Sequence, residues 1–413
     1  MDHDTPPSEP QNVPFGKRLQ IIRERRGLTR TVLGGLVGKS GEWVKAVEKG
    51  RIDTPKLPIL LKLAEALRVR NLNELTGDQS LSVDIFTGPG HERLPAVRAA
   101  VNKLPALLGD RDAPPVEHLR ARLSQAWAAR HSSPYHRDVL GRLLPDLITD
   151  AQLAAHQAED RTTRRRAQAV LAETYALAQF FIAYQPAQDL LWRVAERGMV
   201  AAQDSGDLHA IGVASWLMAQ AHRDAGDWDA ADLVTTDTVA LLEPRAADDG
   251  ADALAMHGSL VFESGYTAAR AGRMGDAWRN YDQAAAIASG LPGDYYHPVT
   301  SFSRAIMGAH ATTIAVELRA GGESVRQSER APASAIPSRP RRARHEVEQA
   351  RAYHLDAQHQ AAMATLEGAH EAAPETIRYN GYARRIVLEE LDAREPARRR
   401  RASDLAHRIG MLT

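Results

Sequence analysis

Basic side chains gather in one short stretch near the start of this 413-residue chain. Between Phe15 and Arg51 the sequence has ten lysines and arginines but only three glutamates, so this stretch carries a net charge of +7. The whole chain has a net charge of zero. Ammonium and guanidinium groups bind phosphate oxygens through charge-assisted hydrogen bonds. A basic stretch within a neutral protein therefore predicts a phosphate-binding surface of the kind that nucleic acids require.

The same stretch contains a partial nucleotide-binding motif. The segment from Gly34 to Ser40 ends in Gly-Lys-Ser, as a phosphate-cradling P-loop does. The complete motif needs a glycine at the position of Leu33 and a β-strand before the loop, and the sequence has neither. We therefore expect no nucleoside triphosphate site here.

Motifs of enzymatic chemistry are missing from the rest of the sequence. The chain has no cysteine, which excludes disulfides, thiolate metal ligands and a cysteine nucleophile, and fits a reducing cytoplasm. None of the 16 histidines belongs to an H-E-x-x-H motif, although the segment from His345 to Gln349 comes nearest. No G-x-S-x-G nucleophile motif occurs. We expect a protein that is not an enzyme, with no cofactor and no metal.

Two short helices with a tight turn between them are predicted to position the basic side chains. The first begins after Thr29, whose hydroxyl can accept an otherwise unpaired amide hydrogen. Gly38 ends this helix at a position where the chain needs a positive φ. Apolar residues at helical spacing give the helix one apolar stripe: Val32, Leu33, Leu36 and Val37.

The second short helix begins after Ser40, another suitable capping residue. Val44 and Val47 lie three residues apart, so both are expected to face inward. Amphipathic helices flank the pair, from Phe15 to Arg26 and from Leu57 to Val69. The other residues of the second helix are expected to face outward: Gly41, Glu42, Trp43, Lys45, Ala46 and Lys49.

This pattern resembles the helix-turn-helix of the Cro/CI or XRE repressor superfamily. Gly34 stands where that family has a very small residue, and Gly38 matches its turn glycine. Val44 and Val47 match the paired core positions, and Glu48 begins a segment that matches the family's E-x-G-x ending. The resemblance implies a small all-α DNA-binding domain over residues 15–77. The alternative is a pair of helices that only pack against each other.

The resemblance also implies that the helix from Ser40 to Lys49 enters the major groove of double-stranded DNA. Lys45 is the main candidate for a base or phosphate contact, and Glu42 could accept a hydrogen bond from cytosine or orient Lys45. Trp43 could stack on a sugar or a thymine methyl, or pack against its own domain. The candidate DNA contacts are Arg30, Thr31, Lys39, Ser40, Gly41, Glu42, Trp43, Lys45, Lys49 and Arg51. The two arginines, Lys39 and Lys49 are expected to bind phosphates, which set register rather than sequence.

The rest of the chain predicts helices and no convincing strand. Small and aromatic residues recur at offsets that resemble the helix pairs of tetratricopeptide (TPR) repeats. In residues 260–290, Gly265 takes the small position, Gly272 makes the turn, and Ala277 and Tyr281 line the second helix. Similar offsets occur in residues 212–244, 343–374 and, more weakly, 172–191, with a degenerate unit in residues 302–320. The spacing is irregular, so we expect a TPR-like domain, with a generic helical bundle as the alternative.

A TPR-like domain offers a concave surface to peptides, partner helices or a second copy of the chain. We expect a ligand, if there is one, at the loop from Asp294 to Pro298. The basic runs at residues 339–344 and 398–401 are expected to be solvated faces, with a second nucleic-acid contact as the alternative. The aromatic residues that could line a groove are Trp216, His222, Trp228, Tyr266, Trp278 and Tyr281, although such residues more often belong to a core.

The sequence therefore predicts a disordered tail at residues 1–14, a helix-turn-helix domain at 15–77, a linker with connecting helices at 78–165 and a TPR-like domain at 166–413. The resemblance implies a sequence-specific transcriptional regulator that is a homodimer through its C-terminal part and senses a peptide, protein or small ligand. The chain has no run of ~18 apolar residues that could span a membrane. We expect a cytoplasmic protein that joins the nucleoid when bound to DNA. The alternative is an interaction adaptor whose helix-turn-helix no longer binds specific DNA, which the charge of +7 disfavours.

Overall fold

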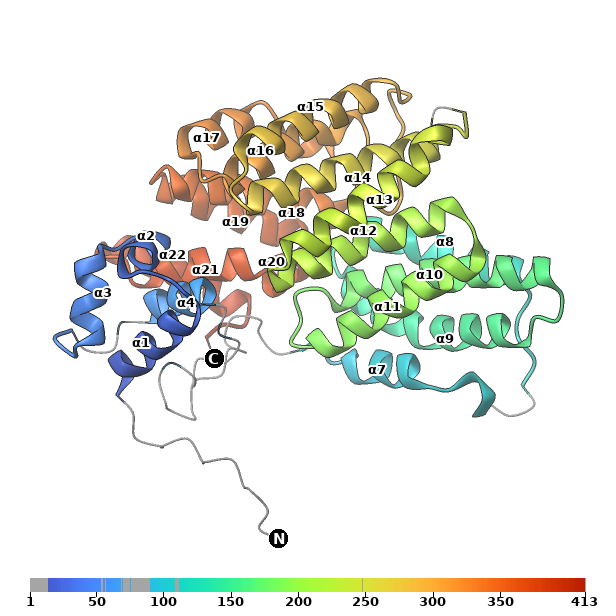
Figure 1. Cartoon of the computed structure of the whole chain (residues 1–413), viewed down its shortest axis with the longest axis horizontal. Coiled ribbons are helices and arrows are strands. Elements are labelled where there is room, and N and C mark those ends of the chain that lie inside the picture. The colour runs from blue at the N-terminus through green and yellow to red at the C-terminus, as the bar shows by residue number, and fades with distance from the viewer. Residues whose placement is uncertain are drawn as a thin grey trace, which may run out of the picture. The chain divides into compact units, whose positions relative to one another are not determined.

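The computed structural model describes residues 14–52, 55, 57–67, 69, 75, 90–107, 111–246 and 248–412. The chain divides into two compact units, Met1–Gly88 (unit 1) and Pro89–Thr413 (unit 2). Every regular element in the described ranges is helical (Figure 1). This confirms the predicted all-α fold, a small helix-turn-helix bundle followed by helix pairs. The predicted disordered tail lies outside the described residues except for Pro14.

The described helices of unit 1 are α1 (Phe15–Arg25), α2 (Arg30–Leu36), α3 (Gly41–Glu48) and α4 (Leu57–Ala66). Helix α3 packs against α1 and α2, and α2 also packs against α4. Apolar side chains from all four helices are buried at their centre: Phe15, Leu19, Leu33, Val37, Val44, Val47, Leu60 and Leu63.

The predicted apolar stripe of α2 is only half buried. Leu33 and Val37 lie in the core, whereas 49% of Val32 and 46% of Leu36 remain exposed. Neighbouring residues point about 100° apart around a helix, so a short helix packed on its 33/37 side turns the 32/36 side to solvent. Of the four residues in the apolar stripe, only Leu33 and Val37 therefore contribute to the core.

Unit 2 is built from consecutive helices that pack as pairs, among them α10 with α11, α14 with α15 and α18 with α19 (Figure 1). The helices before residue 230 are α7 (Leu94–Asn102), α8 (Val116–Ser132), α9 (His136–Gln157), α10 (Arg161–Ile182), α11 (Gln188–Ser205), α12 (Leu208–Ala225) and α13 (Trp228–Ala246). The later ones are α14 (Ala251–Arg270), α15 (Met274–Ser289), α16 (Met307–Glu317), α17 (Gly321–Glu329), α18 (Arg339–Leu355), α19 (His359–Ala372), α20 (Pro374–Tyr379), α21 (Gly381–Leu391) and α22 (Pro396–Arg408). Short 3-10 helices are η1 (Pro105–Leu107), η2 (Arg304–Ile306) and η3 (Ala333–Ala335).

Small residues let the paired helices approach closely. A Cβ atom added to Gly265 on α14 would lie 3.1 Å from the carbonyl oxygen of Ala277 on α15. Gly272, between the two helices, has a φ of +79°, which favours glycine. Ala277 and Ala284 of α15 are fully buried. The approach of α14 and α15 therefore depends on the absence of larger side chains at these positions.

The helices of residues 116–165 belong to the same packed body as those that follow. Leu123 of α8, Leu144 of α9 and Val170 of α10 are buried in one continuous apolar cluster. Helix α10 runs across the predicted boundary between residues 165 and 166. The domain limits derived from the sequence remain a prediction.

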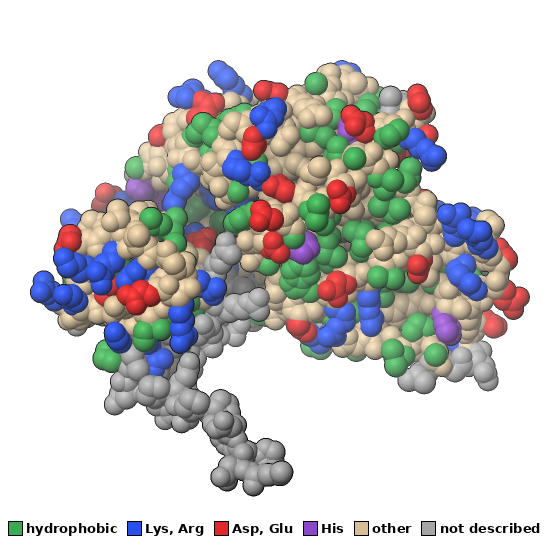
Figure 2. All heavy atoms as spheres, viewed as in Figure 1, with side chains coloured by type: hydrophobic (Ala, Val, Ile, Leu, Met, Phe, Trp, Pro, Cys, Tyr) green, Lys and Arg blue, Asp and Glu red, His purple; other side chains and the backbone are tan. Residues whose placement is uncertain are grey.

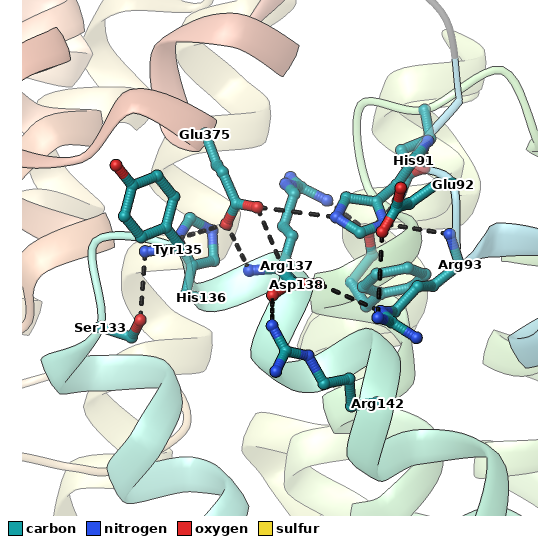
Figure 3. Close-up of polar contacts among 12 residues, drawn as sticks. His91, Glu92, Arg93, Ser133, Tyr135, His136, Arg137, Asp138, Arg142 and Glu375 are labelled. Carbon is teal, nitrogen blue, oxygen red and sulfur yellow. Dashed lines mark hydrogen bonds and ion pairs between the residues drawn. The ribbon is translucent and has the colours of Figure 1, made fainter.

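A carboxylate from late in unit 2 caps a helix from early in that unit. Glu375 of α20 accepts hydrogen bonds from the backbone N–H groups of Arg137, at 2.6 Å, and Asp138, at 3.2 Å, in the first turn of α9 (Figure 3). His91 and His136 lie beside the same carboxylate, at 3.6 and 3.8 Å. Because the first amides of a helix lack partners within it and its N-terminus favours a negative charge, Glu375 stabilises both the helix end and the contact between distant segments.

Replacing Glu375 by alanine is expected to lower the stability of this contact by about 1.5–3 kcal/mol, the range for hydrogen bonds to a charged group. Amide hydrogen exchange in residues 136–140 should accelerate accordingly. Glu371→Ala, which removes an exposed carboxylate from the preceding helix, is the control and should leave exchange there unchanged. Equal exchange in both variants would contradict the capping role.

Candidate nucleic-acid interface

Hydroxyl groups cap the two helices that carry the predicted contacts. Thr29 accepts a hydrogen bond from the backbone N–H of Val32 at 3.2 Å, and Ser40 accepts one from the N–H of Trp43 at 3.1 Å. Gly38 lies between the helices with a φ of +70°. Both predicted caps and the predicted turn are confirmed.

Two glycines allow the start of α3 to lie against α2. A Cβ atom on Gly34 would come within 2.8 Å of the carbonyl oxygens of Lys39 and Ser40. A Cβ atom on Gly41 would come within 3.1 Å of the backbone of Thr31. Backbone atoms cannot move away as a flexible side chain can, so a larger residue at Gly34 would change the angle between the helices.

A buried ion-pair network joins α3 to α1 and α2. The side chain of Glu48 is 1% exposed and accepts hydrogen bonds from Nε of Arg23, at 2.5 Å, and from Nε of Arg30, at 2.6 Å. Arg23 also donates Nη1–H to the carbonyl oxygen of Leu28 at 2.7 Å. The hydrogen bond to Glu48 is the chief cause that raises the pKa of Arg23. Glu48 thus sets the position of α3 relative to both preceding helices.

Glu48 is a structural residue that the sequence analysis used only as part of the family ending. The sequence could have predicted that Glu48 is buried, because Val44, Val47 and Glu48 follow the i, i+3, i+4 spacing of one helix face. Arg30, which the sequence assigned to phosphate binding, has its Nε bound to Glu48 and 38% of its side chain exposed. The contact with Glu48 gives Arg30 a structural role, and its phosphate contact stays a prediction.

The outward face of α3 carries the polar and basic residues that the sequence placed there. Nζ of Lys45 lies 3.2 Å from Oε1 of Glu42, and 41% of the lysine side chain and 82% of the glutamate side chain are exposed. Nζ of Lys39 lies 5.9 Å from the ring centroid of Trp43, which is partly buried. The remaining predicted contacts Thr31, Lys49 and Arg51 are exposed. In Figure 2, basic side chains are prominent on the visible face of unit 1.

The structure gives the ligand candidates of unit 2 different roles. His297 is fully buried, and its Nδ1 accepts backbone hydrogen bonds from Val299 and Thr300, so it organises its own loop. Tyr295 donates its hydroxyl hydrogen to Asp252 at 2.5 Å. The aromatic residues proposed for a groove pack in separate contacts, Trp216 with Phe180, His222 with Trp192, Tyr266 with Phe262, and Trp278 with Tyr281.

The basic runs are only in part the solvated faces that the sequence predicted: Arg339, Arg399 and Arg400 are exposed, and the other arginines are partly buried. Arg341 and Arg344 are only partly exposed, and Arg344 pairs with the buried Glu348. In the second run, Arg398 pairs with Glu390 and Arg401 pairs with Glu367. Glu348 lies one turn from Arg344 on the same helix, whereas the packing of different helices brings Glu390 to Arg398 and Glu367 to Arg401. The local sequence could not reveal the last two contacts.

One cluster in the described part of the chain has the side-chain types of a metal site. The ligand atoms of His354, His359 and Glu390 lie within 4.8 Å of one another. Glu390, however, already accepts hydrogen bonds from Nε and Nη2 of Arg398, both at 2.8 Å. The guanidinium neutralises the carboxylate, so the cluster is explained as an ion-pair network. None of the described helices has the length and apolar character that crossing a membrane would demand.

Comparison with curated proteins gives no match. Among solved structures, the chain is similar to Bacillus thuringiensis PlcR in complex with the peptide PapR7 and DNA, at 13% identity and a TM-score of 0.28, with 86% of this chain and 99% of that chain covered. It is also similar to ComR from S. thermophilus in complex with DNA and its signalling peptide ComS, at 16% identity and a TM-score of 0.20, with 67% and 93% covered. At these TM-scores neither similarity supports an argument about this chain. The family model described as "Helix-turn-helix domain" matches residues 14–75, and this part of the chain is therefore a helix-turn-helix domain.

Proposed function

We propose that the chain is a sequence-specific transcriptional regulator of the Cro/CI or XRE type. Helix α3 enters the major groove of DNA, and unit 2, with TPR-like helix pairs, supplies the dimer contact and senses a peptide, protein or small ligand. The observation that carries the proposal is the capped helix α3, which keeps a polar and basic outward face within a helix-turn-helix domain. Such a regulator works in the cytoplasm and joins the nucleoid when it is bound to DNA.

The proposed reading of bases rests on the pair formed by Glu42 and Lys45. In the major groove a carboxylate accepts from the amino group of cytosine, and a lysine donates to O6 and N7 of guanine. Both groups are exposed and lie next to each other near the start of α3, the part of a recognition helix that reaches base edges. Lys39, Lys49 and Arg51, at the ends of α3, then bind phosphates and hold the register.

The test is selection of bound sequences from a random DNA pool by the full chain. We expect an enriched motif arranged as an inverted repeat, because two copies of a helix-turn-helix related by two-fold symmetry bind two half-sites. A single half-site would contradict the dimer and leave the DNA-binding proposal intact. Absence of any enriched motif would favour the adaptor over the regulator.

Lys45→Ala is expected to weaken binding to the selected site roughly 5- to 150-fold, the equivalent of about 1–3 kcal/mol for a base contact, and to relax specificity at one position. Lys49→Ala should weaken binding to all sequences and lower the salt dependence by about one counterion. Titrations by fluorescence anisotropy at several fixed salt concentrations separate the two effects.

Lys103→Ala, which removes an exposed lysine at the end of α7, is the matched control. It should leave both the affinity and the salt dependence unchanged. If Lys45→Ala bound as tightly as the control, Lys45 would not contact the DNA.

A further inference from the structure

Arg130 is a buried cation of unit 2 that has no carboxylate partner among the described residues. The residue lies near the end of α8 and is 8% exposed. Its guanidinium carbon lies 4.1 Å from the ring centroid of Phe180 and 5.7 Å from that of Trp127. Its Nε has no hydrogen-bond partner, and its polar contact is the approach of Nη1 to Nδ1 of His131 at 3.4 Å. Stacking on aromatic rings covers a face of a guanidinium and leaves its N–H edge available for a ligand.

Arg341 of α18 is a second cation without a partner in the described part of unit 2. Glu348, the acidic residue of α18 whose charge acts on Arg341, already pairs with Arg344 and, at 2.6 Å, with Arg351. No carboxylate in the described ranges lies within ion-pair distance of Arg341. Helix α18 therefore carries a positive charge that its own acids do not balance.

Tyr296 lies near both arginines through His131, which follows Arg130 on α8 and hydrogen-bonds Ser338 at the start of α18. The charges of both Arg130 and Arg341 act on its hydroxyl, and the two guanidinium groups act on each other. The hydroxyl oxygen has no hydrogen-bond partner in the described structure, and the ring meets His131 edge-on at 6.2 Å. Tyr296 and Arg341 are each partly exposed, whereas the hydroxyl oxygen of Tyr296 is itself buried.

Neighbouring hydrogen bonds hold this arrangement together. His131 bonds the hydroxyl of Ser338 through Nδ1, at 2.8 Å, and donates Nε2–H to the carbonyl oxygen of Pro298, at 2.7 Å. Burial lowers the pKa of His131 to about 4, so this histidine is neutral at physiological pH and adds no charge. Burial also lowers the pKa of Arg130, to about 10, which still leaves that guanidinium charged. The site thus joins α8, α18 and the loop that contains Tyr296.

A buried guanidinium without a counter-charge is costly, and a second one close by adds repulsion. An oxyanion placed between them would offset both effects, and carboxylates and phosphates match the N–H edge of arginine with two parallel hydrogen bonds. We propose that Arg130, Arg341 and Tyr296 bind the oxyanion group, a carboxylate or a phosphate, of a small molecule. This inference rests on the sensing role proposed for unit 2 and names the ligand chemistry of that role.

The test is isothermal titration of the full chain, without DNA, in a buffer that contains neither carboxylate nor phosphate. The probes are inorganic phosphate and benzoate, and we expect at least one of them to bind saturably. The probe that binds distinguishes a phosphate ligand from a carboxylate ligand. Saturable binding of neither probe would overturn the proposal, whatever the outcome of the DNA experiments.

Arg341→Gln should weaken binding of the probe roughly 10- to 100-fold, since it removes a charged hydrogen-bond donor. Tyr296→Phe, which removes only the hydroxyl, should weaken it roughly 2- to 12-fold. Arg339→Gln removes an exposed charge from the same helix and should bind as the wild type does. If Arg339→Gln and Arg341→Gln lost equal affinity for the probe, the probe would bind by general electrostatic attraction, and the proposed site would be wrong.

Thermal unfolding separates a ligand-binding role of Arg341 from a structural one. Without anion, Arg341→Gln should unfold at the same temperature as the wild type or higher, because it removes an unbalanced charge. The probe should raise the unfolding temperature of the wild type and leave that of the variant unchanged. A variant that unfolds at a lower temperature without anion would show that Arg341 stabilises the fold itself and would contradict the proposal.

Discussion

Replacing Glu48 by alanine is expected to destabilise unit 1 by about 3–5 kcal/mol and to abolish DNA binding, because breaking a buried ion pair leaves an uncompensated charge. The side chain of Arg23, which is 7% exposed, would lose the carboxylate that faces its Nε and would keep only the exposed carboxylate of Glu24, at 3.2 Å from Nη2. Arg30 would lose its contact with α3 at the same time. Helix α3 would then keep its caps but lose the interaction that orients it against α1 and α2.

Hydrogen exchange measured by mass spectrometry on the full chain reports this effect on unit 1 alone. Amides of α1 and α3 should exchange much faster in Glu48→Ala, whereas those of unit 2 should not change. Glu42→Ala removes a carboxylate from the exposed side of the same helix and should preserve the protection of unit 1. If Glu48→Ala kept wild-type protection, the network would not contribute to the stability of unit 1.

Replacing Glu263 by leucine is expected to destabilise unit 2 by a similar amount, about 3–5 kcal/mol. Glu263 of α14 accepts a hydrogen bond from Nη1 of Arg223 of α12, and the two side chains are 3% and 4% exposed. Burial raises the pKa of Glu263, and the charge of Arg223 opposes that shift. Arg223 also lies over the ring of Tyr266 at 4.1 Å, so it could not swing out to solvent once Glu263 was gone.

The matched variant is Arg223→Met combined with Glu263→Leu. Replacing both members of a buried pair with apolar residues of similar size is often neutral or stabilising, so the double variant should recover most of the lost stability. Urea unfolding followed by circular dichroism compares the two variants with the wild type. A double variant as unstable as Glu263→Leu would mean that the cost came from packing rather than from an unpaired charge.

The sequence by itself determined the local structure of unit 1. Thr29, Ser40 and Gly38 define the helix ends and the turn through interactions within a few residues of each, so their roles do not depend on the rest of the fold. The apolar spacing that continues through unit 2 determined an all-α chain for the same reason. The sequence also determined the roles of Gly265 and Gly272, because both residues act between α14 and α15, which are adjacent in the sequence.

The tertiary structure decided which charges are paired. Glu48 meets arginines 25 and 18 residues away, and Glu375 meets α9 across more than 230 residues, so no local pattern predicts either contact. The same packing brings Arg401 to Glu367 and leaves Arg130 and Arg341 without a carboxylate partner among the described residues. Electrostatic energy depends on distance and burial, which only the assembled helices set. The sequence located the basic domain and the loop that holds Tyr296, and the fold alone decided which of their side chains remain available to a ligand.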